Sequence, residues 1–249
     1  MTNNRVVNYV FKYMGDENKN NLEEYISKTL TREYTDFTEI DIMNITPELS
    51  EEEKIILRDY ISYESAHINA TLRHTWNYEA NGNIENKTRY EEKGKKLVDL
   101  ISKKPTNTGN KKVYRGIDIN YFKQFGISSL EELFNLKNNY ILDEGVVSTS
   151  VKEESCFYKR NLGPNTNYNI KVIYYLPEEF NDGIFLGSKD LKLYEESEDE
   201  YLINKYNLGY VFDVEINNQE QTAQLKVMMI PKKVYDDYYK NQEEINKSK

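Results

Sequence analysis

The sequence predicts an α+β fold, because helical and β-rich segments occupy different parts of the chain. Up to about residue 105, apolar residues recur at the three- and four-residue spacing of amphipathic helices. After about residue 110 the segments become short and rich in β-branched and aromatic residues, as strands are. Helices followed by strands are typical of α+β domains.

Helices are expected at five places in the first half. The clearest start is Ser50, which is followed by Glu53 and preceded by Pro47, the pattern of a capping box. The last of these helices ends before Pro105 and a polar stretch. The expected helices cover residues 5–14, 21–31, 51–63, 65–74 and 86–102.

Strands are expected after residue 110, with short helical pieces at about 120–125 and 129–136 and after Pro231. The segment 200–217 is interpreted as a pair of strands with Gly209 near the bend. The expected strands lie within residues 112–117, 140–151, 167–177, 200–217 and 223–231.

The composition indicates a folded protein and argues against nucleic-acid binding as its main function. Hydrophobic residues make up 38% of the 249 residues, and 22 Tyr and 9 Phe supply apolar surface that a disordered chain lacks. The formal net charge is −9, whereas a protein that neutralises many phosphates is basic. No apolar run approaches the roughly 18 residues of a membrane span, and the first residues lack the apolar region of a signal peptide. We therefore expect a soluble protein that acts where it is made or injected.

One cysteine and two histidines argue against a structural zinc site built from Cys and His. Cys156 is the one cysteine, which excludes an internal disulfide, and no local histidine pattern would activate it as a nucleophile. His67 and His74 fall near one helix face but have no third ligand. We expect both histidines in packing or at the surface, Trp76 in the core, and no bound metal.

Two segments carry residues that suit an anionic ligand. Arg115 lies on an expected strand and is followed by Gly116. Such an arginine usually makes a structural ion pair, but it can also hold a phosphate while the glycine lets a ligand approach the backbone. The second segment is Ser148-Thr149-Ser150, which is ordinary strand sequence or a set of hydroxyls that orient a charged neighbour.

The third segment is the acidic run from Glu195 to Glu200. Charge runs are usually solvated loops. This one leads directly into an expected strand, where Glu198 and Glu200 share one face and Asp199 faces away. Paired carboxylates raise each other's pKa and suit acid–base work on a cation or a sugar hydroxyl.

The order of these three motifs resembles the R-S-E signature of arginine-specific mono-ADP-ribosyltransferases, of the type found in binary actin-modifying toxins and phage-encoded enzymes. Upstream, Tyr60, Asn69 and Arg73 are similar to the tyrosine and INxxLR helix of that family. Downstream, Phe157 and Arg160 have the Phe-x-x-Arg spacing of its NAD-clamping loop. The resemblance covers about residues 50–235.

The resemblance implies an ADP-ribosyltransferase fold, in which two packed, roughly perpendicular β-sheets surround an NAD cleft beside an N-terminal helical layer. No internal repeat or flexible linker interrupts the sequence, so we expect one domain over residues 1–249. Its parts would be an N-terminal helical segment (1–49), a catalytic core (50–235) and a C-terminal tail (236–249).

The resemblance also implies roles for the residues that match, with NAD as co-substrate and no metal. Arg115 would hold an NAD phosphate, and the Gly116 backbone would meet the nicotinamide carboxamide. The remaining NAD contacts would come from the helix and the clamping loop, with Tyr60, Asn69 and Arg73 on the adenosine and phosphate side, Phe157 on nicotinamide and Arg160 on phosphate.

The catalytic group would centre on Glu200, which would bind the 2′-hydroxyl of the nicotinamide ribose. Ser148 would hydrogen-bond Glu200, while Thr149 and Ser150 brace the strand and contribute to the cofactor site. Glu198 would engage the acceptor, because in this family a glutamate there accompanies arginine acceptors.

The sequence departs from the family pattern at two positions. Ser65 stands where the toxins place a second tyrosine, and Tyr114 where some have an additional arginine. The segment 182–197 would be the acceptor-recognition loop, with Tyr194 near its usual aromatic residue.

The implied function is transfer of ADP-ribose from NAD to an arginine of a target protein, with release of nicotinamide. We favour a phage-encoded enzyme that modifies host proteins in the bacterial cytoplasm. The alternatives are a toxin or injected effector that modifies a eukaryotic protein such as actin, an NAD glycohydrolase, and an inactive binding module.

Overall fold

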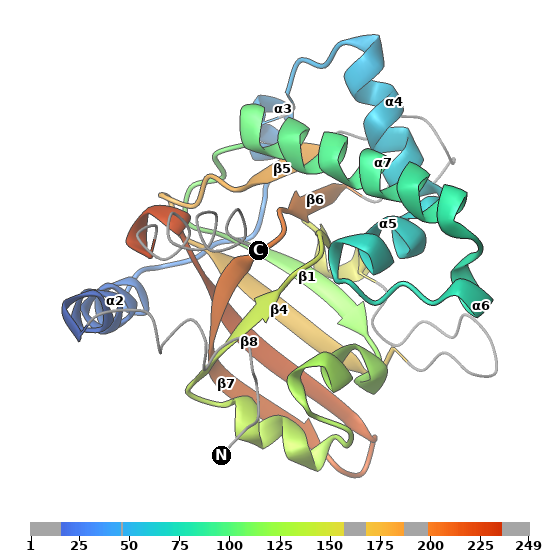
Figure 1. Cartoon of the computed structure of the whole chain (residues 1–249). Helices are drawn as coiled ribbons and strands as arrows, with labels where there is room; N and C mark the ends of the chain where they lie inside the picture. Colours follow the sequence, from blue (N-terminus) through green and yellow to red (C-terminus); the bar gives the residue numbers. More distant parts are fainter. Residues whose placement is uncertain (1–15, 46, 157–167, 187–198, 236–249) are drawn as a thin grey trace.

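A computed structural model describes residues 16–45, 47–156, 168–186 and 199–235 (Figure 1). Helices dominate its first part and strands its second, which confirms the expected α+β class. In the described part of the chain, no helix combines the length and apolar character needed to span a membrane. The α-helices are α2 (Asp16–Thr29), α3 (Glu39–Ile45), α4 (Glu51–Asp59), α5 (Ser65–Leu72), α6 (Tyr78–Asn81) and α7 (Ile84–Lys103).

The expected helices that fall within the described residues are present, with one change of geometry. The Ser50 hydroxyl accepts from the amide of Glu53, whose carboxylate accepts from the amide of Ser50, which confirms the capping box. The expected helix over 51–63 instead ends at Asp59 and continues as a π-helical turn, Tyr60–Glu64, before α5 begins. The helix expected over 5–14 lies outside the described residues.

Within the described residues, eight strands form one mixed sheet in the order β2-β7-β8-β4-β1-β3-β6-β5. Strands β4 and β8 pair in parallel, and the other pairs are antiparallel. Short 3₁₀ helices cover Ile119–Phe125, Glu131–Leu136 and Lys232–Val234, where helical pieces were expected, and also Glu153–Ser155. The strands are β1 (Lys111–Ile117), β2 (Asn139–Asp143), β3 (Val147–Ser150), β4 (Ile170–Leu176), β5 (Gly183–Leu186), β6 (Glu200–Ile203), β7 (Asn207–Asn217) and β8 (Thr222–Ile230).

The sheet narrows between β1 and β3. These strands are joined at one residue pair, Tyr114 with Ser150, whereas β1 and β4 pair over their whole length. The five strands from β2 to β1 therefore form one part of the sheet, and β3, β6 and β5 form another. The two expected sheets correspond to these two parts, connected by a single narrow junction.

The interpretation of the segment 200–217 was right about two strands and wrong about their bend. Strands β6 and β7 lie in different parts of the sheet and do not pair with each other. The chain turns before β7, at Tyr206, whose φ is +57°. Gly209 lies inside β7, where a Cβ atom would come within 2.6 Å of Val227 Cγ1. Close packing between strands, and not a turn, therefore explains this glycine.

The proposed acceptor loop over 182–197 begins with a strand that the sequence analysis missed. Its apolar residues Ile184, Phe185 and Leu186 form most of β5, are buried, and pair with β6. Residues 187–198, including Tyr194, lie outside the described residues.

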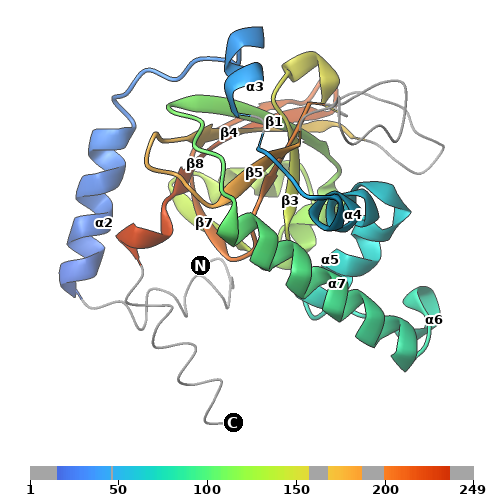
Figure 2. The same ribbon diagram turned by 90° about the horizontal axis from the view of Figure 1, so that it is seen from above.

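Helices cover different regions of the sheet (Figures 1 and 2). A core that includes Leu57, Ile68 and Leu97 joins α4, α5 and α7 to β5 and β6. Helix α2 packs elsewhere, through Leu22 and Ile26, against β7 and β8. Burying a leucine or isoleucine side chain contributes about 1.5–3 kcal/mol, so the first core holds the small part of the sheet firmly beside α5.

Candidate active site

Strands β3 and β6 bring Ser148 and Glu200 together at the narrow junction of the sheet. Ser150 is paired with Glu200 and Ser148 with Leu202, so Ser148 and Glu200 are diagonal neighbours on one face. The Ser148 hydroxyl donates to Oε1 of Glu200. The contact that the resemblance implied is therefore present in the structure.

Arg115 lies on β1, next to the residue that pairs with β3. Its guanidinium carbon is 4.8 Å from the centre of the Tyr121 ring, a cation–π distance. Nη1 of Arg115 is buried and has no hydrogen-bond partner among the described residues. A buried guanidinium nitrogen is costly to leave unpaired, and no described residue supplies the structural ion pair that is usual for a strand arginine.

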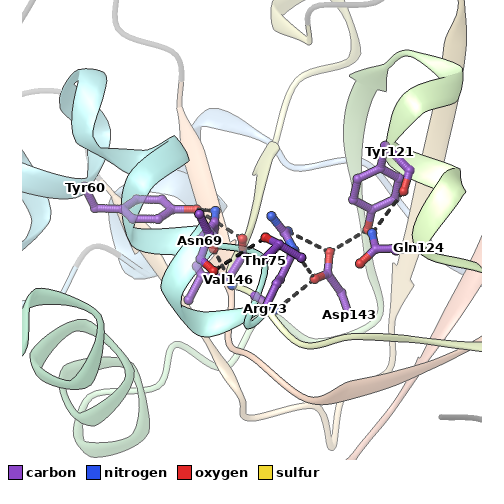
Figure 3. A network of polar contacts seen from close by, with 10 residues as sticks. Tyr60, Asn69, Arg73, Thr75, Tyr121, Gln124, Asp143 and Val146 are labelled. Carbon is purple, nitrogen blue, oxygen red and sulfur yellow. Dashed lines mark hydrogen bonds and ion pairs between the residues drawn. The ribbon is translucent and has the colours of Figure 1, made fainter. Parts of the chain in front are cut away.

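Tyr60 comes from the π-helical turn and closes a ring of hydrogen bonds with Asn69 and Val146 (Figure 3). Its hydroxyl donates to the Val146 carbonyl at 3.1 Å and accepts from Asn69 Nδ2 at 3.0 Å. The Val146 amide in turn donates to Asn69 Oδ1 at 2.9 Å. The ring joins α5 to the residue that precedes β3, and so fixes the start of the strand that carries Ser148.

The pKa of Tyr60 is raised to about 12, chiefly by burial and secondly by the negative charge of Glu200. The positive charge of Arg115 acts in the opposite direction. Glu200 and Arg115 therefore both lie within electrostatic range of the Tyr60 hydroxyl. The hydroxyl remains protonated at neutral pH and can keep both of its hydrogen bonds.

Arg73, at the end of α5, is held by Asp143 at the end of β2 (Figure 3). Nε donates to Oδ1 at 2.7 Å and Nη2 donates to Oδ2 at 2.9 Å, a bidentate pair. Burial acts to lower the pKa of Arg73, but Asp143 outweighs it and the pKa is raised. The sequence analysis missed Asp143. The available signal was a carboxylate at the end of an apolar strand, two residues before Gly145.

The other hydroxyls of β3 and the residue before Glu200 make backbone and ion-pair contacts. Thr149 Oγ1 donates to the Tyr201 carbonyl of β6 at 2.6 Å, and Ser150 Oγ accepts from the Lys152 amide at 3.3 Å. Asp199 is buried and pairs with Lys152 Nζ at 3.0 Å. Gly116 is buried on β1 and paired with β4. Three expected site residues, Glu198, Phe157 and Arg160, lie outside the described residues.

The histidines, the tryptophan and the cysteine occupy packed or surface positions. His67 stacks on Tyr90 with ring centres 5.0 Å apart, which confirms its expected packing role. His74 is exposed, Trp76 is partly buried and Cys156 is buried. Across residues 16–235, apart from the undescribed segments, no cluster of three His, Cys, Asp or Glu side chains is arranged to hold a metal.

A protein-family model described as ADP-ribosyltransferase exoenzyme matches residues 14–233. The chain belongs to this family. A comparison with curated proteins finds no match.

Several solved structures show the same fold. The C3stau2 protein of S. aureus, solved with NAD, is 18% identical, covers 80% of this chain and 100% of its own, and has a TM-score of 0.59. The Clostridium limosum C3 exoenzyme is 15% identical, with 80% and 98% covered and a TM-score of 0.58. The enzymatic component C2-I of the Clostridium botulinum C2 toxin is 19% identical, with 80% of this chain but 50% of C2-I covered and a TM-score of 0.53. The ADP-ribosyltransferase fold that the sequence predicted is therefore confirmed.

Proposed function

We propose that this protein transfers ADP-ribose from NAD to an arginine side chain of a target protein and releases nicotinamide. The observation that carries the proposal is the Glu200 carboxylate, held by Ser148 in the same small region as Nη1 of Arg115, which is buried and has no partner among the described residues. A carboxylate suits the positive charge of a reacting ribose, and a buried guanidinium suits a phosphate.

The residues present fit NAD as the co-substrate. A phosphate oxygen would satisfy the buried Nη1 of Arg115, and Arg73 would supply a second cation on the same side. The neighbouring Tyr60 and Asn69 would hold the walls of this site in place through their hydrogen bonds to Val146. Backbone contacts and rigidity would come from Gly116, Thr149 and Ser150. The clamping loop would be supplied by Phe157 and Arg160.

Glu200 would supply the main catalytic effect. As the bond between nicotinamide and ribose breaks, positive charge develops on the ribose, and a nearby carboxylate stabilises that charge. The hydrogen bond from Ser148 keeps the Glu200 carboxylate oriented. Glu200 would at the same time bind the ribose 2′-hydroxyl.

Glu198 would orient the acceptor. An arginine guanidinium is a poor nucleophile because its pKa is above ~12, so a second carboxylate is needed to take its proton as the new bond forms. A solved structure of the ADP-ribosyltransferase Vis contains agmatine, a small guanidinium compound. Vis is 15% identical to this chain, with 76% and 79% covered and a TM-score of 0.54.

The test uses labelled NAD with bacterial and eukaryotic lysates in parallel. We expect label on bacterial proteins, as for a phage enzyme that modifies its host. A treatment that cleaves arginine linkages is expected to remove this label. Label on a eukaryotic band alone would identify a toxin or effector, a setting supported by the likeness to the C2 toxin component. Nicotinamide release with no labelled protein would identify an NAD glycohydrolase and contradict the acceptor role of Glu198.

Two glutamate variants separate the two roles. Glu198→Gln is expected to lose transfer to arginine and keep some NAD hydrolysis, whereas Glu200→Gln is expected to lose both. Equal activity of Glu200→Gln and the wild type would contradict the site assignment.

A further inference from the structure

Asp143 is a buried carboxylate with every side of its carboxyl group in use (Figure 3). Oδ1 accepts from Arg73 Nε at 2.7 Å and from the Gly145 amide at 2.8 Å. Oδ2 accepts from Arg73 Nη2 at 2.9 Å and from the Tyr121 hydroxyl at 2.6 Å. Four hydrogen bonds hold the carboxylate, and in return it holds two side chains that come from distant parts of the chain.

This pairing determines which edge of the Arg73 guanidinium is available. Nε and Nη2 face Asp143, which leaves Nη1 outside the pair, and the side chain keeps 19% of its surface exposed. A bidentate carboxylate fixes both the position and the plane of a guanidinium. Asp143 therefore presents Arg73 in one orientation, with one nitrogen directed away from the pair.

The same carboxylate reaches Arg115 through Tyr121. The Tyr121 hydroxyl is bound to Asp143, and its ring lies 4.8 Å from the Arg115 guanidinium. A ring held at its hydroxyl end cannot move from under the cation without breaking that hydrogen bond. Asp143 thus acts directly on one arginine and indirectly on the other.

The charges explain why such a carboxylate is needed. Arg115 and Arg73 are close enough to interact. Burial acts most strongly to lower the pKa of Arg115, and the positive charge of Arg73 acts more weakly in the same direction. The neighbouring tyrosines and Asp143 act to raise this pKa, and the net direction is upward. Two buried like charges repel each other strongly where the dielectric constant is low, and Asp143 is the buried anion that offsets this repulsion.

We propose that Asp143 is a positioning residue that aligns Arg73 and Arg115 for the diphosphate of NAD. The inference rests on the proposed function, because it concerns the same NAD site. Asp143 itself would not touch the substrate. Its effect would pass through Arg73 directly and through Tyr121 to Arg115.

The experiment measures the affinity of ADP-ribose, which contains the diphosphate but no nicotinamide, by calorimetry on the full-length protein. The variants are Asp143→Asn, Arg73→Gln and the double variant. Asn keeps the shape of Asp but replaces one acceptor oxygen with an NH₂ group that faces donors. We expect Asp143→Asn to weaken binding about tenfold, as expected for one lost charge-assisted interaction. In the Arg73→Gln background we expect a smaller further loss, about threefold, because only the indirect effect through Tyr121 and Arg115 remains.

A purely structural role would give a different result. Equal weakening by Asp143→Asn in both backgrounds, or no weakening at all, would overturn the inference. Asp213→Asn is the matched control, since Asp213, on β7, also pairs with two cations, Lys137 and Lys226, neither of which belongs to the proposed NAD site. This variant is expected to bind ADP-ribose like the wild type.

A second variant keeps the inference testable if Asp143→Asn does not fold, which circular dichroism would show. Tyr121→Phe retains the ring under Arg115 and removes only its hydroxyl, and we expect it to weaken ADP-ribose binding about threefold. Unchanged binding by Tyr121→Phe would overturn the indirect effect on Arg115. Absence of ADP-ribose binding by the wild type would instead contradict the proposed NAD site, and with it this inference.

Discussion

Arg73 and Arg115 lie in one region of the molecule, yet their surroundings differ. Arg73 is paired through two nitrogens with Asp143, which also binds Tyr121 and the Gly145 amide. Arg115 packs on the ring of Tyr121 and buries an Nη1 that has no partner in the described part of the chain. Buried polar groups are normally hydrogen-bonded. The Asp143 carboxylate is therefore fully paired as folded, whereas the phosphate of the proposed NAD co-substrate would complete the contacts of Arg115.

The same contrast separates the two faces of β3. Thr149 is buried and donates to the backbone of β6, whereas Ser148 is partly exposed and donates to the Glu200 carboxylate. On β3, a change at the Thr149 contact should reduce stability, and a change at the Ser148 contact should reduce activity. The predictions below test this division in order of decreasing effect.

The largest effect is expected for Glu200→Gln. The amide keeps the size of the side chain and an acceptor for Ser148, but it removes the charge that stabilises the reacting ribose. We expect nicotinamide release to fall by about 10²–10³-fold, as for the loss of a well-placed electrostatic group. Glu215→Gln, an exposed glutamate of β7 that pairs with Lys226, is the control and should retain full activity.

Ser148→Ala and Thr149→Val form a pair that compares the two faces directly. Loss of the Ser148 hydroxyl should lower the rate of NAD cleavage about tenfold, because a hydrogen bond to a charged group contributes about 1.5–3 kcal/mol. Thr149→Val should leave the rate near that of the wild type and lower the free energy of unfolding by about 1 kcal/mol. The reverse pattern in nicotinamide release and urea unfolding would contradict the division.

Gly145→Ala tests the turn that surrounds Arg73. A Cβ atom at Gly145 would lie 2.7 Å from Cζ and Nε of Arg73 and 2.8 Å from Asn69 Oδ1. Both groups are held by hydrogen bonds, so the extra methyl must displace the guanidinium or the turn. We expect the KM for NAD to rise about fivefold with little change in kcat, the pattern of lost ground-state binding. An unchanged KM would show that Arg73 can shift without consequence.

The smallest effect concerns the buried hydroxyl of Tyr60. Its pKa is raised to about 12 in the folded protein, compared with about 10 for an ordinary tyrosine. A raised pKa favours the folded state below pH 10, and this contribution is lost as pH rises toward 12. Between pH 9 and pH 11, we expect the loss of this contribution to lower the free energy of unfolding by about 1 kcal/mol. The same pH step in Tyr60→Phe should produce a smaller decrease, which urea unfolding at both pH values would measure.

Local signals in the sequence predicted much of the fold. The capping box at Ser50 and Glu53 depends on residues three apart, and the strand around Arg115 depends on its own composition. The path of β6 and β7 was misread. The local sequence does not reveal which strands each segment pairs with, and only that pairing distinguishes a bend at Gly209 from a turn at Tyr206. Strand β5 is four residues long and was hidden in a segment interpreted as a loop.

The candidate site also shows that local sequence signals do not reveal contacts between side chains far apart in the chain. Ser148 and Glu200 stood out because each lies in a short motif, and the structure brings them into contact. Asp143 lies in no motif, and its importance comes from Arg73, seventy residues earlier. The π-helical turn at Tyr60 was read as ordinary helix, because the periodicity of apolar residues does not reveal one extra residue per turn.

The contacts of the site also determine when it can form during folding. Tyr60 and Val146 are 86 residues apart in the chain, Arg73 and Asp143 are 70 apart, and Ser148 and Glu200 are 52 apart. Each contact requires a long loop to close, and contacts between distant residues form slowly. Strands β1 and β3 meet at one pair only, so no local ladder assembles the site ahead of the rest. Recovery of NAD cleavage after dilution from denaturant should therefore follow the slowest phase of sheet formation and lag behind the recovery of helical signal.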